Sequence, residues 1–322
     1  MPTLPYGTLH LFVETNSHFL PPELYQTIIE HYSEVVLPHS ETGSPHGYMP
    51  ETKHVVGRHK ALRPLLFASK ATYREATCLI YRSTCIDLQE REGRGFQLLR
   101  MIAISPHITE HIVKFGLTVT TTPEVLEREH IGDGEVKDLL LACLQRMPRL
   151  TSWTLSHAAG ALPLILQSLL RDERPFRLTC FHLFCQQEAD PFLWQFVQSQ
   201  EYITSFGYAS YAGDSYPIPP SDVHLLPRVA DLRVPGPMAC SILRTRPRPT
   251  LKSLRIDLRR APDTLPWTNT GSIQSLSIVA LGRPPSEVIT TISAFRNLEN
   301  VFLVVKYSAE WVGHYRTSLS KV

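Results

Sequence analysis

The sequence lacks the features that mark several large classes of protein. Its 322 residues contain 6 cysteines at irregular spacings, unlike the dense pattern of a disulfide-stabilised secreted domain. Lys and Arg number 32 against 30 Asp and Glu. The resulting net charge of +2 lacks the strong positive excess that is typical of proteins that bind DNA or RNA. No run approaches the roughly 20 apolar residues of a membrane span. We therefore expect reduced thiols and a protein that binds neither nucleic acid nor membrane.

The two ends of the chain show no clear targeting signal. Residues 1–7 include no basic side chain, and the apolar stretch 9–13 is too short for the core of a signal peptide. Residues 320–322 are Ser-Lys-Val and lack the final Leu of the peroxisomal signal. These observations predict a cytoplasmic or nuclear location, or both.

Proline, by contrast, is abundant. The 26 prolines make up about 8% of the chain, where about 5% is usual. Hydrophobic residues account for 43%, which is enough for a packed core. Because proline can neither continue a helix nor sit in a central strand, the core must be built from many short elements. The length allows one large domain or two ordinary ones.

A helix is predicted over residues 20–32. Two prolines stand in its first turn, where backbone N–H groups have no helical partner. The negative charge of Glu23, also in the first turn, interacts favourably with the positive end of the helix dipole. Leu24 and Ile28 lie on one face, with Ile29 on an adjacent stripe, so the apolar surface is broad enough to touch more than one neighbour. We expect a short N-terminal extension, 1–19, before this helix.

The next segment, 38–60, is rich in proline, glycine and histidine and is predicted to be a flexible loop. A metal site is the alternative, but the histidine spacings match no zinc pattern. Helical periodicity resumes at Ala61, where Leu65 and Leu66 belong to one apolar face. Tyr73, Ala76, Thr77 and Ile80 form a second helical face, and the segment 81–88 has an extended pattern. Three helices of this size have little core of their own and need a partner.

Taken in order, these segments resemble an F-box. The residues that carry the resemblance are Leu20-Pro-x-Glu-Leu24, then Ile28-Ile29, then Leu65-Leu66-x-Ala-Ser-Lys-x-x-Tyr-Arg74, then Leu79-Ile-Tyr-Arg-x-x-x-Ile-Asp-Leu88. They are most similar to the F-box of the large fungal families with a degenerate leucine-rich-repeat-like C-terminal domain. The alternative is a small helical cap that only covers the end of the domain that follows.

The remaining two thirds of the chain repeat one template, apolar-x-x-apolar-x-apolar. The template begins at residues 112, 150, 178, 203, 229, 251, 273 and 298. After the first interval, the spacings fall within the 20–29 residues of leucine-rich repeats. Helical segments precede most copies, and prolines stand in the turns before several of them, which accounts for the proline excess. The asparagine of regular leucine-rich repeats is missing, so the resemblance is to the irregular kind.

The predicted fold is therefore α/β: an all-α, three-helix F-box-like domain over 20–90, followed by an irregular leucine-rich-repeat solenoid over 95–322. Stacked strand–helix units would bury a continuous core, with parallel strands on the concave side and helices on the convex side. An ordinary doubly wound α/β domain is the alternative. That fold would require longer, more uniformly apolar strands and usually a glycine-rich ligand loop.

The template also predicts side-chain direction, because successive strand residues point to opposite faces. Trp153, Leu155, Leu254 and Ile256 should point into the core. The positions between such residues should face the concave surface, where solenoids usually bind their partners. The candidate target-binding residues on that surface are His182, Phe184, Arg233, Arg255, Asp257 and Phe302, with Ser277 beside them.

No motif supports catalysis. The sequence has no nucleophile elbow, phosphate-binding loop or dinucleotide fingerprint. His107 and His111 lie four residues apart but follow Pro106 and precede a strand pattern, and the pair Cys180 and Cys185 has no second pair nearby. We therefore predict no enzyme activity, no cofactor and no metal. A cryptic hydrolase would require His182 or His224 within hydrogen-bond reach of a Ser or Cys.

The resemblance implies a substrate-recognition subunit of a cullin-type ubiquitin ligase. Its F-box would dock on the Skp-family adaptor, and its repeats would hold an unidentified target protein. The residues that the resemblance assigns to adaptor binding are Leu20, Pro21, Glu23, Leu24, Ile28, Ile29, Leu65 and Leu66. The second hypothesis is a non-catalytic repeat scaffold whose helical N-terminus is only a cap.

Overall fold

The structure is a computed structural model of the 322-residue chain. It describes residues 66–67, 70–88, 94–119, 133–156, 162–171, 176–185, 191–210, 225–259, 265–280, 282–308 and 311–318. The predicted helix at 20–32 and the predicted loop at 38–60 lie outside the described residues.

Strands and helices alternate along most of the described chain. The strands are β1 (Ser83–Asp87), β2 (Lys114–Thr118), β3 (Ser152–Ser156), β4 (Cys180–Cys185), β5 (Ser205–Ser210), β6 (Asp231–Pro235), β7 (Ser253–Asp257), β8 (Ser275–Val279), β9 (Asn300–Ser308) and β10 (Trp311–Ser318). The helices are α3 (Lys70–Arg82), α4 (Arg94–Ile104), α5 (Pro106–Thr109), α7 (Asp133–Gln145), α8 (Leu162–Arg171), α9 (Pro191–Gln198), α10 (Gly236–Thr245) and α11 (Pro285–Ser293).

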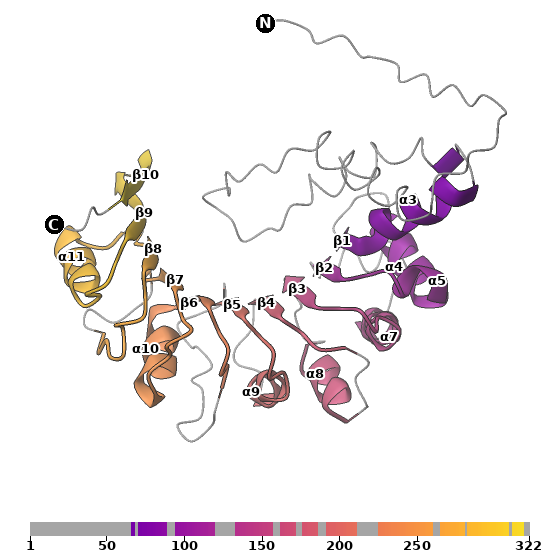
Figure 1. Cartoon of the computed structure of the whole chain (residues 1–322), viewed down its shortest axis with the longest axis horizontal. Coiled ribbons are helices and arrows are strands. Elements are labelled where there is room, and N and C mark those ends of the chain that lie inside the picture. Colours follow the sequence, from indigo (N-terminus) through magenta and orange to yellow (C-terminus); the bar gives the residue numbers. More distant parts are fainter. Residues whose placement is uncertain are drawn as a thin grey trace, which may run out of the picture.

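The strands form one sheet in which spatial order follows sequence order from β1 to β10. Strands β1 to β9 are all parallel, and only β10 runs antiparallel, as the partner of β9. The sheet bends into an arc, with the strands along its inner side and helices such as α7, α8, α9 and α10 along its outer side (Figure 1). The predicted α/β class, with parallel strands inside and helices outside, is confirmed for the described residues.

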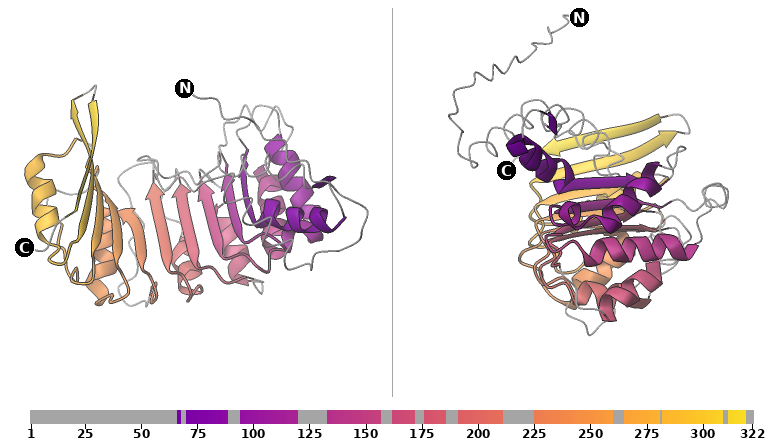
Figure 2. Two further views of the ribbon diagram at one scale, coloured as in Figure 1. Left: turned by 45° about the horizontal axis from the view of Figure 1, so that its top comes forward. Right: turned by 90° about the vertical axis from the view of Figure 1, so that its right-hand side faces the viewer.

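Each copy of the template corresponds to one strand. The strand begins two residues after the first template position in every case, from β2 after Ile112 to β9 after Leu298. The template did not include β1 or β10. β9 and β10 are the longest strands described, at 9 and 8 residues, and they project beyond their neighbours (Figure 2).

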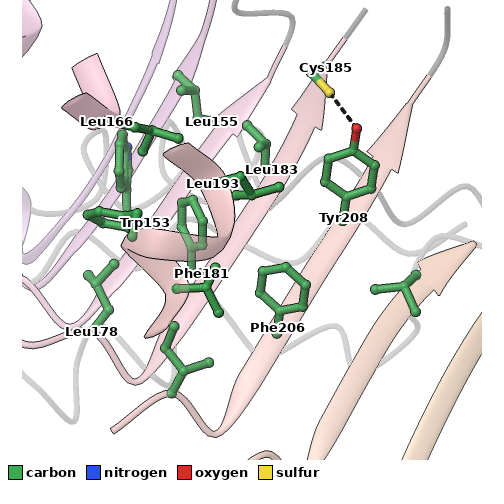
Figure 3. Packing of buried hydrophobic residues seen from close by; sticks show 14 of the residues in the cluster. Trp153, Leu155, Leu166, Leu178, Phe181, Leu183, Cys185, Leu193, Phe206 and Tyr208 are labelled. Atoms are coloured by element: carbon green, nitrogen blue, oxygen red, sulfur yellow. Dashed lines mark hydrogen bonds between the residues drawn. The ribbon is translucent and has the colours of Figure 1, made fainter. Parts of the chain in front are cut away.

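The core lies between the sheet and the outer helices. Trp153, Leu155, Leu254 and Ile256 are all fully buried there, as predicted. Aromatic rings form its centre: the ring centroids of Trp153 and Phe181 are 5.3 Å apart, and those of Phe181 and Phe206 are 6.2 Å apart (Figure 3). Contacts of this kind stabilise the core beyond the area they bury.

A ladder of threonines joins successive units where the strands begin. The Thr179 hydroxyl donates to the carbonyl oxygen of Thr151 at 3.2 Å, and the Thr204 hydroxyl donates to that of Thr179 at 3.1 Å. Further along the chain, Asn269 and Asn297 donate to carbonyls of the preceding unit, Leu243 and Gly271. The threonine bonds add to backbone hydrogen bonds that join the same units, and the asparagine bonds satisfy carbonyl groups between units, as an asparagine ladder does in regular repeats.

The N-terminal end of the sheet meets the segment that resembles an F-box. Helix α3 packs against β1 and α5, while Leu79 and Ile80 form a small cluster with Leu66, separate from the main core. Strand β1 falls within the predicted 20–90 domain, yet it pairs with β2 of the sheet. The proposed module therefore contributes a strand to the repeat sheet, and the division at residue 90 stays a prediction.

Candidate interaction surface on the strand face

The inner side of the sheet, here called the strand face, carries its side chains in register. Parallel pairing brings one residue from each strand into a row that crosses the sheet. The central row consists of Cys85, Gly116, Thr154, His182, Gly207, Arg233, Arg255, Ser277 and Phe302. Four of the six candidate target-binding residues, from β4, β6, β7 and β9, belong to this single row.

A second row lies two residues earlier on each strand. It consists of Ser83, Lys114, Ser152, Cys180, Ser205, Asp231, Ser253, Ser275 and Asn300. Most members are small and polar, so the strand face offers hydroxyl groups next to the charged side chains of the central row. A face of this composition suits recognition of a polar partner surface better than burial against an apolar one.

Four side chains of the two rows form a hydrogen-bonded chain across β4, β5 and β6. The Nε2 atom of His182 lies 3.1 Å from the Oγ atom of Ser205, and the Ser205 hydroxyl donates to Oδ2 of Asp231 at 3.1 Å. The Nε atom of Arg233 donates to the same Oδ2 at 2.8 Å. The arrangement fixes the position of the imidazole and neutralises the carboxylate.

This chain of bonds also determines the tautomer of His182. The hydroxyl proton of Ser205 points to Asp231, so its oxygen can only accept from the imidazole, and Nε2 therefore carries the hydrogen. Burial, followed by the positive charge of Arg233, lowers the pKa of His182 to about 4, although Asp231 acts in the opposite direction. At neutral pH the ring is uncharged, and its Nδ1 atom is a hydrogen-bond acceptor.

The other candidate residues differ in how much side-chain surface they leave available to a binding partner. Asp257 is held by Arg259, whose Nη2 and Nε atoms bind its Oδ2 at 2.5 and 2.9 Å. Phe184 is only 5% exposed and presents little surface. Arg255 and Phe302 are half-buried members of the central row. His182, Arg233 and Arg255 are thus brought together, whereas Asp257 and Phe184 lie in the next row along the strands.

The cluster of His182, Ser205 and Asp231 contains the residue types of a hydrolytic triad, but in a different order. In a triad the serine donates to the imidazole, and the carboxylate accepts from the other ring nitrogen. Here the carboxylate accepts from the serine, and Arg233 binds the same oxygen atom. The backbone N–H of Ser205 donates to the Thr179 carbonyl, so it cannot stabilise an oxyanion. His224 lies outside the described residues.

Ser205 and Asp231 were missed by sequence reasoning. Both occupy the same template position, two residues before Gly207 and Arg233 of the central row. Aligning the template copies would have placed them beside His182. Their hydrogen bonds could not have been inferred, because they depend on side-chain rotamers.

Most of the predicted adaptor-binding residues lie outside the described part of the chain. Leu20, Pro21, Glu23, Leu24, Ile28, Ile29 and Leu65 belong to that group. The remaining one, Leu66, is half-buried and packs against Leu79 and Ile80.

The six cysteines, all within the described ranges, are free thiols. Cys180 lies on the strand face 3.6 Å from Nε2 of His182, while the buried Cys185 donates to the Tyr208 hydroxyl oxygen at 3.2 Å. Among the residues that the structure describes, no three His, Cys, Asp or Glu side chains are grouped closely enough to hold a metal ion. In the same part of the chain, no helix has the length and apolar character to cross a membrane.

Neither a scan against protein-family models nor a search of curated proteins finds a match for this chain.

Proposed function

We propose that this chain is the substrate-recognition subunit of a Skp-adaptor, cullin and F-box ubiquitin ligase. The N-terminal helices would dock on the adaptor, and the strand face would bind a target protein. The chain itself would perform no bond chemistry. Its part would be to hold the target where the ligase can reach it.

One observation supports the part of the proposal that concerns binding of the target protein. Parallel pairing aligns residues, most of them polar or charged, into two rows across nine strands, and the His182, Ser205 and Asp231 cluster within these rows does not have the order of a catalytic triad. A long, curved, in-register surface of this kind is what solenoids use to bind partners. The adaptor half rests on the order of F-box-like motifs in the sequence.

Copurification tests the adaptor half. The chain would be coexpressed with a Skp-family adaptor, as wild type and as the double variant Leu24→Asp with Ile28→Asp. Buried aliphatic side chains contribute roughly 1.5–3 kcal/mol each at an interface, so two charges in their place should abolish adaptor recovery. Recovery of the adaptor at the wild-type level by this variant would refute the proposal.

A matched control uses two aliphatic residues that are exposed elsewhere in the chain. Ile104, at the end of α4, is 75% exposed, and Ile289, in α11, is 64% exposed. The double variant Ile104→Asp with Ile289→Asp introduces the same chemistry and should leave adaptor recovery unchanged. Thermal unfolding of both double variants would show that each is folded.

A second candidate function is supported by the packing of α3. This helix contacts β1 and α5 at the first end of the sheet, which is where the cap of a repeat scaffold would lie. The scaffold function would be favoured if the wild-type chain recovers no adaptor but retains partner proteins in an affinity purification. Those partners should be lost when Arg233 and Arg255 of the strand face are both changed to Glu.

A further inference from the structure

A second polar surface lies at the edge of the sheet where β3 to β6 begin. The residues Ser152, Cys180, Ser205 and Asp231 pair in register across these strands. Three positions before each of them, the chain places Arg149, Arg177, Tyr202 and Arg228, all exposed. We call these four residues the edge row. It runs across the strand starts and is separate from the strand face.

Two arginines of the edge row stack on the same aromatic ring. The guanidinium carbon of Arg177 lies 5.4 Å from the centroid of the Tyr202 ring, and that of Arg228 lies 4.7 Å from it. Stacking holds a guanidinium by its face and leaves the N–H groups around its rim available to a ligand. The ring therefore keeps two positive charges in fixed positions at an exposed site.

Among the described residues, no carboxylate pairs with these charges. Within the described ranges, Arg149, Arg177 and Arg228 form no ion pair, whereas the arginines at 233, 259 and 283 each bind an Asp or Glu. Exposed arginine and tyrosine side chains are also the types most enriched at protein interfaces. The edge row is thus a positively charged surface, in which Nη1 of Arg177 also donates to the Tyr202 hydroxyl oxygen at 3.5 Å.

A pocket of about 350 Å³ opens beside Tyr202. Its lining comes from Phe176, Arg177, Ser199, Gln200, Glu201 and Tyr202. Glu201 places a negative charge next to the arginines, which would repel a continuous polyanion such as a nucleic acid backbone. A peptide suits the site better, because it can place a carboxylate on an arginine and a backbone N–H near Glu201.

The strand spacing gives the length of the ligand. Neighbouring strands lie about 4.8 Å apart. Arg177 and Arg228 precede strands that are two positions apart in the sheet, so their backbones are separated by about 10 Å. An extended peptide advances about 3.3 Å per residue, so side chains three residues apart span the same distance. Planar guanidinium groups bind carboxylates through two parallel hydrogen bonds.

We propose that the edge row binds an extended acidic segment of a partner protein. Two carboxylates three residues apart would bind Arg177 and Arg228, with the ring of Tyr202 between the two guanidinium groups. This goes beyond the proposed ligase function and does not depend on it, because neither the adaptor nor the strand face takes part.

The test uses the purified full chain and a fluorescein-labelled synthetic peptide with two Glu three residues apart and Leu between them. We expect binding, measured by fluorescence anisotropy, that weakens as salt is added. The double variant Arg177→Gln with Arg228→Gln should bind about tenfold more weakly. Tyr202→Leu keeps both charges but loses the stacking, and we expect roughly a threefold loss.

Two controls make the result specific. Arg171→Gln with Arg244→Gln removes two exposed charges from α8 and α10 and should bind the peptide as the wild type does. A peptide with Gln in place of both Glu should not bind the wild-type chain, and this comparison holds even if an edge-row variant fails to fold.

Three results would overturn the proposal. The first is equal affinity of the wild type and the Arg177→Gln, Arg228→Gln variant for the Glu peptide. The second is equal affinity of the wild type for the Glu and Gln peptides. The third is tighter binding through the same arginines of a single-stranded RNA oligonucleotide or of vesicles containing phosphatidylserine.

Discussion

The imidazole of His182 occupies the space above Gly207 on the neighbouring strand. A Cβ atom on residue 207 would lie 2.7 Å from Cδ2 of His182, closer than such atoms approach in proteins. The two residues are paired in register between β4 and β5, and the ring continues toward Ser205 on β5. The missing side chain at 207 is therefore what lets the imidazole lie flat enough to join the hydrogen-bonded chain to Asp231.

We expect Gly207→Ala to lower the free energy of unfolding by about 1–2 kcal/mol. The added methyl group must displace the His182 ring, although the loss of glycine's flexibility in the unfolded chain offsets part of the cost. Urea unfolding followed by tryptophan fluorescence would measure the change. Adding His182→Ala should remove the conflict, so the double variant should lose less stability than the two single variants together.

A control for this prediction is Gly134→Ala in the first turn of α7. No atom lies within 4 Å of a Cβ at that position. Alanine should raise the free energy of unfolding by up to about 1 kcal/mol there, because it favours the helix. If both glycine variants changed stability in the same direction and to the same extent, the conflict with His182 would not exist.

We expect stability to depend on pH through His182. Its folded-state pKa of about 4 lies below the usual value of 6.5, so the unfolded chain binds the proton more readily between these values. The contribution is fully present above about pH 6.5 and is lost as the pH falls toward 4. By pH 5 the wild type should have lost about 2 kcal/mol relative to the variant His182→Gln.

Unfolding of both proteins at pH 7.5 and pH 5 would measure this difference. Thr154→Val alters the neighbour of His182 on β3 without a titrating group, and its effect should be the same at both pH values. If the free energy of unfolding of the wild type and of His182→Gln depended on pH in the same way, the His182 ring would not be buried as described.

We expect Ser205 not to react as a nucleophile. Its hydroxyl proton is directed to Asp231, and Arg233 donates to the same carboxylate oxygen. The purified chain should therefore remain unlabelled by a fluorophosphonate probe that modifies activated serines, as judged by intact mass. Labelling that disappears in Ser205→Ala would instead establish a hydrolytic site on the strand face.

We expect Phe181→Ala to cost about 3–5 kcal/mol of stability, because it leaves a cavity among the rings of Trp153, Phe196 and Phe206. The same change at Phe302, a half-buried residue of the strand face, should cost clearly less. Urea unfolding of the two variants compares the faces of the sheet directly. Equal losses would contradict the assignment of Phe302 to the binding face.

The repeat pattern made the parallel strands predictable. A period of two residues within each template copy indicates which side chains are buried, and a spacing of 22 to 28 residues between later copies leaves room for one helix and two turns. This local information identified Trp153 and Ile256 as core residues and His182 and Arg233 as residues of the opposite face. The template did not predict strand β10, because an antiparallel strand at the end of the sheet does not follow it.

The sequence by itself determined which residues form strands and which side of each strand is apolar, since both depend on neighbours along the chain. Only the tertiary structure decided the register between strands. That register aligns His182 with Ser205 and Asp231, opens space for the ring at Gly207, and brings Arg177 and Arg228 to one tyrosine. These contacts join residues 23 to 26 positions apart, where pairing across the sheet, rather than local periodicity, determines which side chains meet.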